Sequence, residues 1–391
     1  MPLNHTLGRR RRARRTVIAM TLGVVMSLVA AGCGGGGGGG SSGGSQAADP
    51  LVKVGQKQIA EAEKPLKFTP PGPPVDAAKA RERTVLVLSV DQRVPTLAAA
   101  ATAMKQAGAV AGLKVDVFDA QADVSRMQQG VTQAINQKVG AMILLGIPTE
   151  LVRSKLGTTK IPAIAVLNND PRPDEPGQGA GRNVYATSAP PYTKAGQLLA
   201  YKAIVDRDGK ANVVIFNSTG IDPAAPTVQG IKSVLDRCTG CKSRMNDTPL
   251  ADWSTKLPGL AQSEIRRDPN VNYLLPIFDG MGLFAATGVR QAGAAERVKL
   301  AAFNGVPAAL ALVQKGDVFA ADPGQSNEWI GWHAIDQSLR GMLGMKPADP
   351  EVPLRFFDTK SLQGVDVKDE GALYGTAFRA GYRKLWGVGG G

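Results

Sequence analysis

Residues 115–148 read VDVFDAQADVSRMQQGVTQAINQKVGAMILLGIP, and this stretch decides the fold. It opens with a short apolar run, VDVF, and closes with a longer one, AMILL, at 141–145. Between the two runs, apolar residues recur on one face of a helix, which Asp123 would cap at its start and Gly140 at its end. A strand, a helix and a second strand that is apolar throughout predict a parallel sheet covered by helices.

The same alternation continues in both directions along the chain. Apolar strand patterns occur at 84–90 and 163–167, and a second series runs from 212–216 to 318–322 with helical patterns between its strands. Two such series predict an α/β protein with two doubly wound parallel-sheet lobes. In sheets of this kind ligands bind beyond the carboxyl ends of the strands.

Residues 1–32 have the layout of a secretory signal peptide. The opening MPLNHTLGRRRRARR has no acidic residue, and the apolar run of about 16 residues that follows is short for a membrane span. Ala-Ala-Gly-Cys at 30–33 resembles the lipobox of bacterial lipoproteins, although Ala30 stands where leucine is usual. We therefore expect Cys33 to carry lipid; an uncleaved anchor helix and an unmodified thiol are the alternatives. The arginines leave export by the Sec or the twin-arginine route open.

Residues 33–82 are rich in glycine, serine and proline and show little hydrophobic periodicity. Together with the lipidated cysteine they are predicted to form a disordered tether. Roughly 50 flexible residues have a root-mean-square reach of ~40 Å.

Charge and composition argue against several classes of function. The formal net charge of +13 falls to +7 once the six arginines of the signal peptide are removed, and the remaining charges are scattered. No nucleic-acid partner is therefore expected. The motifs GxSxG, GxxxxGK[ST] and HExxH are absent from the sequence, and no cofactor is expected.

Cysteine and histidine are scarce. Cys238 and Cys241 form a lone CxxC, and His333 is the one histidine after the signal peptide, so a four-ligand zinc site is hard to assemble and no metal is expected. In an exported chain a local disulfide between the two cysteines is favoured, with a redox-active pair or free thiols as alternatives. His333 falls in a helical pattern, where a histidine more often packs than catalyses.

Residues 119–148 resemble the second strand, helix and third strand of type I periplasmic binding proteins, the ribose-binding-like receptors of bacterial ABC importers. Residues 277–293 and 298–325 resemble later segments of the same family in the same order, and the similarity runs from about Thr84 to Trp386. LacI-type repressors share the two lobes, but they begin with a helix-turn-helix, whereas this chain begins with a signal peptide. The resemblance implies two lobes joined by a multi-strand hinge: an N-lobe of 83–187 plus 326–352 and a C-lobe of 188–325 plus 353–391.

The resemblance also implies a ligand cleft lined by the loops that follow the strands. The candidates in the N-lobe are Asp91, Gln92, Arg93, Asn168 and Asn169, and those in the C-lobe are Trp253, Asp279, Asn304 and Gln325. Amide groups donate and accept as hydroxyls do, and an indole stacks on the apolar face of a sugar ring. Each candidate also has a structural interpretation, as a solvated loop pair, a turn former or a core residue; Phe278, beside Asp279, is expected in the core.

The site departs from the pentose receptors of the family in its charge. Those receptors place Asp-Arg where Asn168 and Asn169 stand, and Asp where Asn304 stands. Fewer charges mean fewer charge-assisted hydrogen bonds, so a neutral and less ribose-like ligand is expected.

These observations predict a lipid-anchored receptor outside the cytoplasm that delivers a small, neutral, sugar-like ligand to an ABC permease, without catalysis. A sensory receptor of the same fold, signalling to a membrane kinase or a chemoreceptor, is one alternative. A cell-envelope enzyme that uses His333 is a second.

Overall fold

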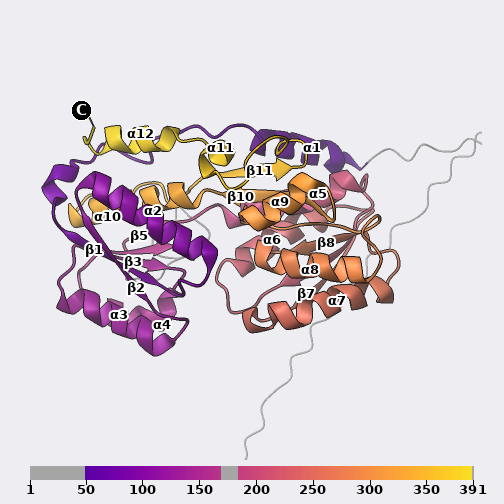
Figure 1. The fold of residues 1–391 in the computed structure, drawn as a ribbon, viewed down its shortest axis with the longest axis horizontal. Helices are drawn as coiled ribbons and strands as arrows, with labels where there is room; N and C mark the ends of the chain where they lie inside the picture. Colours follow the sequence, from indigo (N-terminus) through magenta and orange to yellow (C-terminus); the bar gives the residue numbers. More distant parts are fainter. Residues whose placement is uncertain (1–48, 169–183, 390–391) are drawn as a thin grey trace, which may run out of the picture. The chain divides into compact units, whose positions relative to one another are not determined.

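The computed structural model describes residues 49–168 and 184–389, and the strands of these residues form two sheets (Figure 1). The signal peptide, Cys33 and Asn169 lie outside the described residues. The described part belongs to one compact unit, residues 47–391. None of its helices is long and apolar enough to cross a membrane.

The first sheet has five parallel strands in the order β2-β1-β3-β4-β5. Its strands are β1 (Thr84–Ser89), β2 (Lys114–Asp119), β3 (Ala141–Leu145), β4 (Ala163–Val166) and β5 (Ala186–Ser188). Its main helices are α2 (Pro95–Ala111), α3 (Val124–Asn136), α4 (Thr149–Leu156) and α10 (Asn327–Met342).

Strand β1 shows why an uninterrupted apolar run forms a central strand. Val85 and Val87 pack into the core shared with α2 and α10, whereas Leu86 and Leu88 pack into the core shared with α3 and α4. Both faces of the strand are therefore buried, as the parallel sheet requires.

The second sheet has six strands in the order β11-β10-β9-β8-β6-β7, and only the edge strand β11 is antiparallel. Its strands are β6 (Asn212–Asn217), β7 (Lys242–Asp247), β8 (Tyr273–Pro276), β9 (Lys299–Ala301), β10 (Phe319–Gln325) and β11 (Leu354–Asp358). Its helices are α5 (Tyr192–Asp206), α6 (Ala224–Leu235), α7 (Trp253–Arg267), α8 (Asp279–Gln291), α9 (Pro307–Lys315) and α11 (Glu370–Tyr374). The predicted α/β fold with two doubly wound sheets is confirmed.

Helices α5 and α6 cross unusually closely, and two glycines allow it. A Cβ added at Gly196 would lie 2.0 Å from the carbonyl oxygen of Thr227, and one added at Gly230 would lie 2.1 Å from that of Thr193. Neither helix could carry a larger residue at its glycine without moving its neighbour.

The predicted C-cap at Gly140 is wrong. Helix α3 starts as expected, with the Asp123 side chain accepting from the Arg126 N–H, but it ends at Asn136. Lys138, with φ of 51°, then makes the left-handed turn toward β3. Gly140 instead leads into β3, and its N–H donates to the Thr84 carbonyl.

The predicted tether of residues 33–82 is wrong from Asp49 onward. Helix α1 (Pro50–Ala62) is capped by Asp49, whose carboxylate accepts from the Leu51 N–H at 2.9 Å. It buries Val52, Gly55 and Ile59 against α5 of the second lobe. Only these three positions of the helix are buried, and so sparse a stripe gives a weak sequence signal.

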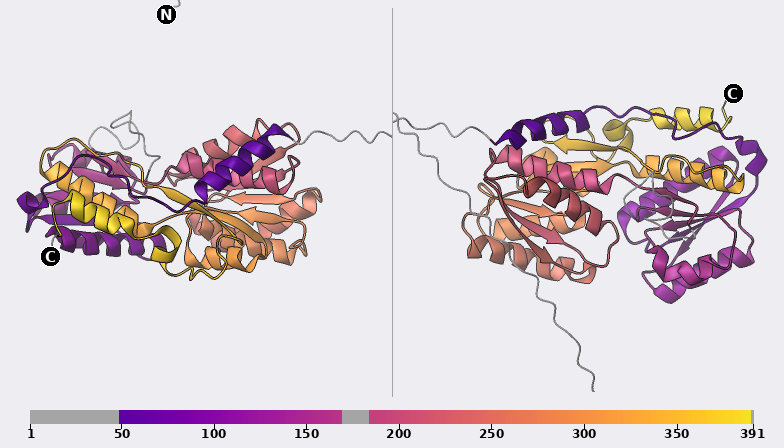
Figure 2. Two further views of the ribbon diagram at one scale, coloured as in Figure 1. Left: turned by 90° about the horizontal axis from the view of Figure 1, so that it is seen from above. Right: turned by 180° about the vertical axis from the view of Figure 1, so that it is seen from behind.

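Residues 63–77, which we call the strap, lead from α1 to the first lobe (Figure 2). Leu66 contacts the cores of both lobes, and the Phe68 ring packs on Tyr382 and Trp329 at centroid distances of 4.9 and 6.1 Å. The Pro71 carbonyl accepts from the Asp349 N–H at 2.9 Å. The strap therefore adds a connection between the lobes that the sequence did not suggest.

The carboxyl-terminal residues also differ from the predicted boundaries, which assign 353–391 to the second lobe. Helix α12 (Ala377–Leu385) packs against α10, so this part joins the first lobe. Trp332 stacks on Trp386 at 5.4 Å and meets Phe378 and Tyr382 at 6.2 Å each. These aromatic side chains recur every four residues along α12 and so share one face of the helix.

Candidate ligand-binding site

Three uncharged polar side chains, those of the buried Ser89 and Asn168 and of the half-buried Gln92, lie where strands of the first sheet end. Ser89 ends β1, Gln92 lies in the loop after it, and Asn168 follows β4. The Asn168 amide donates to the Ile147 carbonyl at 2.7 Å, which fixes its orientation. Ser89 Oγ, Gln92 Nε2 and Asn168 Oδ1 have no hydrogen-bond partner among the described residues. Buried polar atoms in this state are ready to bind a polar ligand.

Asp91 and Arg93 form a pair with each other. The Arg93 guanidinium donates to both carboxylate oxygens of Asp91, at 2.6 Å from Nη2 and 2.9 Å from Nε, and this bonding lowers the pKa of Asp91. The Arg93 side chain is 76% exposed. The two candidates therefore form the loop pair that was the structural interpretation of Asp91 and Arg93.

Trp253, the first residue of α7, forms part of an apolar wall in the second lobe. Its indole N–H donates to Ser218 Oγ and to the Thr248 carbonyl, both at 3.1 Å. Its ring lies 6.4 Å from that of Phe278, and a Cβ at Gly280 would lie 3.0 Å from the indole. With its N–H engaged inside the protein, the indole offers only its apolar face. Phe278 is 7% exposed and belongs to the core, as expected.

Sequence reasoning missed a polar group at the end of β6. The Asn217 amide donates to Asp247 Oδ1 at 3.0 Å, while Asn217 Oδ1 and Thr248 Oγ1 are buried without a partner among the described residues. The available signal was position: Asn217 directly follows the predicted apolar strand 212–216.

Asn304 and Gln325 lie side by side where β9 and β10 end. The Gln325 N–H donates to the Asn304 carbonyl, and the Asn304 N–H donates to that of Pro323, both at 3.3 Å. Gln325 is 1% exposed, and its Oε1 lacks a partner within the described part of the chain. The topology therefore brings these two candidates together.

Asp279 has a different environment from the one predicted. It starts α8, is fully buried, and its Oδ2 accepts from the Val306 N–H at 2.8 Å. The carboxylate thus bonds the turn after Asn304. Asp322, in β10, was missed and bonds the same turn through the Gly305 N–H at 3.1 Å.

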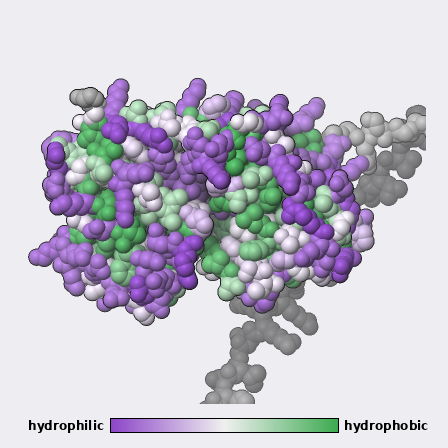
Figure 3. Space-filling model, viewed as in Figure 1, coloured by the Kyte–Doolittle hydropathy of each residue, from purple (hydrophilic) through white to green (hydrophobic). Residues whose placement is uncertain are grey.

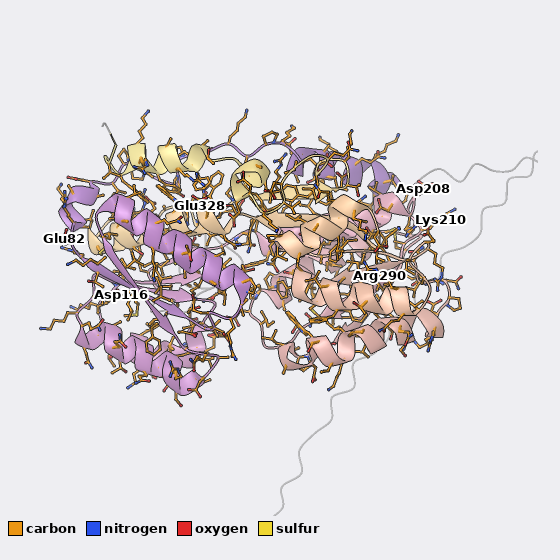
Figure 4. The ribbon with its side chains drawn as sticks, viewed as in Figure 1. Glu82, Asp116, Asp208, Lys210, Arg290 and Glu328 are labelled. Carbon is orange, nitrogen blue, oxygen red and sulfur yellow. A yellow bond between two sulfur atoms is a disulfide. The ribbon has the colours of Figure 1, made fainter. Side chains whose placement is uncertain are left out.

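The charged side chains labelled in Figure 4 belong to both lobes: Glu82, Asp116 and Glu328 to the first, and Asp208, Lys210 and Arg290 to the second. The face in Figure 3 is covered largely by polar residues, with apolar side chains showing between them in small groups.

His333 has no catalytic setting. It is 1% exposed, its Nδ1 lies 2.8 Å from Ser188 Oγ, and its Nε2 lies 2.8 Å from the Asp349 carbonyl. Burial lowers its pKa, so the ring is neutral and both of its nitrogens are engaged between two segments that cross between the lobes.

The remaining predicted groups concern cysteine and metals. Cys238 and Cys241 are joined by a disulfide in the structure, with Cα atoms 5.3 Å apart. Within residues 49–168 and 184–389, no group of three histidine, cysteine or acidic side chains is arranged to hold a metal ion.

Comparison with solved structures gives the same fold. A solute-binding protein of an ABC transporter from Agrobacterium vitis, solved with allitol, is 18% identical, with a TM-score of 0.64 over 72% of this chain and 97% of that one. One from Bacillus halodurans, solved with myo-inositol, is 17% identical, with a TM-score of 0.64 over 74% and 99%. One from Mycobacterium smegmatis, solved with glycerol, is 15% identical, with a TM-score of 0.62 over 73% and 96%.

No curated protein sequence gives a significant match. The family model of the periplasmic binding protein domain, however, matches residues 87–340, which are more than half of the chain. The protein therefore belongs to the periplasmic binding protein family, a family of binding proteins that are not catalytic.

Proposed function

We propose that the protein is an extracytoplasmic solute-binding receptor that delivers a small neutral polyol or sugar to an ABC importer. The observation that carries the proposal is the set of uncharged polar atoms left unpaired where the strands of both sheets end. These atoms belong to Ser89, Gln92, Asn168, Asn217, Thr248 and Gln325. Hydroxyl groups, which donate and accept at once, match them without bringing a charge into the site.

The apolar wall and the similar structures support the same class of ligand. Trp253 offers an apolar face that fits the C–H side of a ring or of a carbon chain. Allitol, myo-inositol and glycerol, present in the structures with a similar fold, are all uncharged polyols. A ligand held by both lobes would favour the closed form, provided that it binds this form better than the open one.

The proposal includes membrane attachment through lipid on Cys33, which the sequence Ala-Ala-Gly-Cys supports. Since α1 begins at Pro50, the tether predicted from the sequence would end before this residue. Replacing Cys33 with alanine should release the protein from the membrane fraction; retention there would contradict the anchor.

A thermal-shift screen of residues 33–391 with Cys33→Ser tests ligand binding. We expect one or more of allitol, myo-inositol, D-arabinose and glycerol to raise the melting temperature, because ligand bound only by the native state stabilises it. Asn168→Ala and Gln325→Ala should weaken the shift, whereas Gln129→Ala, which removes an exposed amide on α3, should preserve it. No shift with any neutral polyol or sugar, combined with a shift from charged solutes, would refute the proposal.

A further inference from the structure

Two buried carboxyl groups hold the turn formed by Asn304, Gly305 and Val306. Asp279 comes from the start of α8 and Asp322 from β10, and neither is exposed to solvent. Asp279 Oδ2 accepts from the Val306 N–H and Asp322 Oδ1 from the Gly305 N–H, at 2.8 and 3.1 Å. Consecutive backbone amides of one turn are therefore bound by two different carboxyl groups.

The other oxygen of each carboxyl group has no hydrogen-bond partner among the described residues. Asp279 Oδ1 and Asp322 Oδ2 are buried without a partner among the described residues, yet the two side chains lie within hydrogen-bonding reach of each other. Two ionised carboxylates so placed would repel in a dry interior, and each would leave one oxygen unsatisfied. One proton on Asp322 Oδ2, donated to Asp279 Oδ1, satisfies both oxygens.

The surroundings supply no cation that could replace this proton. No salt bridge within the described part of the chain includes Asp279 or Asp322. Tyr374 of α11 faces the pair, and Glu370 of the same helix accepts from Ser326 and from the Glu328 N–H. The cation near Tyr374, Arg355 of β11, donates to the carbonyls of Glu63 and Leu373. Burial raises the pKa of Asp279 to about 7, and burial together with the neighbouring Asp279 raises the pKa of Asp322 well above its ordinary value.

The turn itself needs this support. Asn304 has φ of 148° and Gly305 φ of 72°, both in the region that favours glycine. A Cβ at Gly305 would lie 2.2 Å from the Tyr374 hydroxyl, so the turn is also tightly packed. The other backbone bonds of Asn304 are long, at 3.3 Å.

We propose that Asp279 and Asp322 share one proton and act as positioning residues that hold Asn304 in place for ligand binding. This proposal rests on the proposed function, because Asn304 matters only if the site binds a solute. When the shared proton is lost, the two carboxylates repel, one of them moves, and its bond to the turn breaks. Ligand affinity and turn order should both decrease as the pH rises through the raised pKa of Asp322, where the shared proton is lost.

Amide hydrogen exchange at Gly305 and Val306 tests the shared proton without any ligand. In the mature chain with Cys33→Ser, we expect protection, corrected for intrinsic exchange, to fall about tenfold as the pH rises from about 7 through the alkaline range in which Asp322 loses its proton, as for the loss of one hydrogen bond to a charged group. Asp322→Asn should remain protected at every pH, since its amide N–H₂ donates to Asp279 permanently. Asp322→Ala should lose protection at every pH.

Asp222→Asn is the matched control. Asp222 is a half-buried carboxyl group of the same lobe whose pKa burial raises to about 6, but it makes no bond to the turn. This variant should keep the wild-type pH profile. The proposal is overturned if Asp322→Asn keeps that profile, or if it loses as much protection as Asp322→Ala.

Titration calorimetry with myo-inositol, or with the polyol that gives the largest thermal shift, adds the functional readout. The wild-type affinity should fall about tenfold over the same pH range, whereas the affinity of Asp322→Asn should stay level. If no polyol binds at all, the proposed function fails while the exchange result still decides whether the proton is shared. If a polyol binds and its affinity is independent of pH, the positioning role fails alone.

Discussion

Arg340 is the residue whose removal should most strongly destabilise the first lobe. Its side chain is fully buried in α10, and Nε donates to Asp336 Oδ2 at 2.7 Å. Nη2 donates to the Pro73 carbonyl of the strap at 2.9 Å, and the Trp386 indole N–H donates to Asp336 Oδ1 at 2.8 Å. One ion pair thus connects α10 to the strap and to the residue that follows α12.

Replacing Arg340 with methionine keeps much of the volume but leaves the Asp336 carboxylate buried and unpaired. Breaking a buried pair in this way costs ~3–5 kcal/mol of the free energy of unfolding. The matched control is Arg379→Met, which removes the pair between Arg379 and Glu328, in which Arg379 is 44% exposed. An exposed pair of this kind contributes ~0–1 kcal/mol.

Urea unfolding followed by tryptophan fluorescence measures both variants. The double variant Asp336→Asn with Arg340→Met should be less destabilised than Arg340→Met alone, because the introduced amide is uncharged and its oxygen still accepts from the Trp386 indole. Limited proteolysis should also cut Arg340→Met within residues 63–77 sooner than wild type. The reasoning is refuted if Arg340→Met costs no more than Arg379→Met, or if the double variant is the least stable of the three.

Three further predictions concern single side chains. Burial lowers the pKa of His333 in the native state, so below about pH 6.5 the unfolded chain binds a proton more readily than the native one. The free energy of unfolding should therefore fall by up to ~1.4 kcal/mol per pH unit on acidification. Urea unfolding at pH 5 to 7.5 should show this slope, and His333→Gln should flatten it. Gly230→Ala should destabilise the protein by ~1–3 kcal/mol, since the added Cβ would lie 2.1 Å from the Thr193 carbonyl oxygen. Gly259→Ala in α7 should instead stabilise the protein by up to ~1 kcal/mol, because its Cβ would have no atom within 4 Å and alanine favours a helix; thermal unfolding measures both variants. In calorimetry, Trp253→Phe should retain most of the affinity for the polyol, whereas Trp253→Ala should lower that affinity about tenfold or more. The reason is that the ligand would contact the apolar face of the ring, while the indole N–H is already bonded to Ser218 and Thr248. Equal losses of affinity in the two variants would contradict this.

The central strands could be predicted because they are buried on both faces and so carry a continuous apolar signal. Strand β7, with the sequence KSRMND, could not, because it lies at an edge and exposes most of its residues. Helix α1 was missed for a related reason, since its packing depends on a glycine that fits against Tyr201 and Val205 of α5. Edge strands and docked helices derive their stability from partners that are distant in the sequence.

The positions of the candidate residues at the strand ends could be predicted, whereas the bonds that their side chains make could be predicted only in part. Parallel strands end on the same edge of a sheet, so Asn168, Asn304 and Gln325 could be chosen from position alone. The pairing of Asp91 with Arg93 was one of the interpretations of these neighbouring charges, whereas the bond from the Val306 N–H to Asp279 depends on side-chain geometry that no spacing rule conveys. Asp322 was missed because AADPGQ reads as a strand end, and nothing in it indicates that a second carboxyl group lies beside the first.

The docking of α1 changes how the proposed lipid anchor would act on the receptor. Asp49, where the described chain begins, accepts from the N–H of Thr239 in the disulfide turn at 3.3 Å, so the tether reaches the protein at the second lobe. The strap then contacts both cores and bonds Asp349, in the segment between α10 and β11 that crosses between the lobes. Any motion between the lobes must therefore also move the strap, whose contacts through Phe68 and Pro73 lie on the first lobe. Force on the proposed tether would therefore reach the second lobe through α1 first, and the segments that cross between the lobes only through the strap.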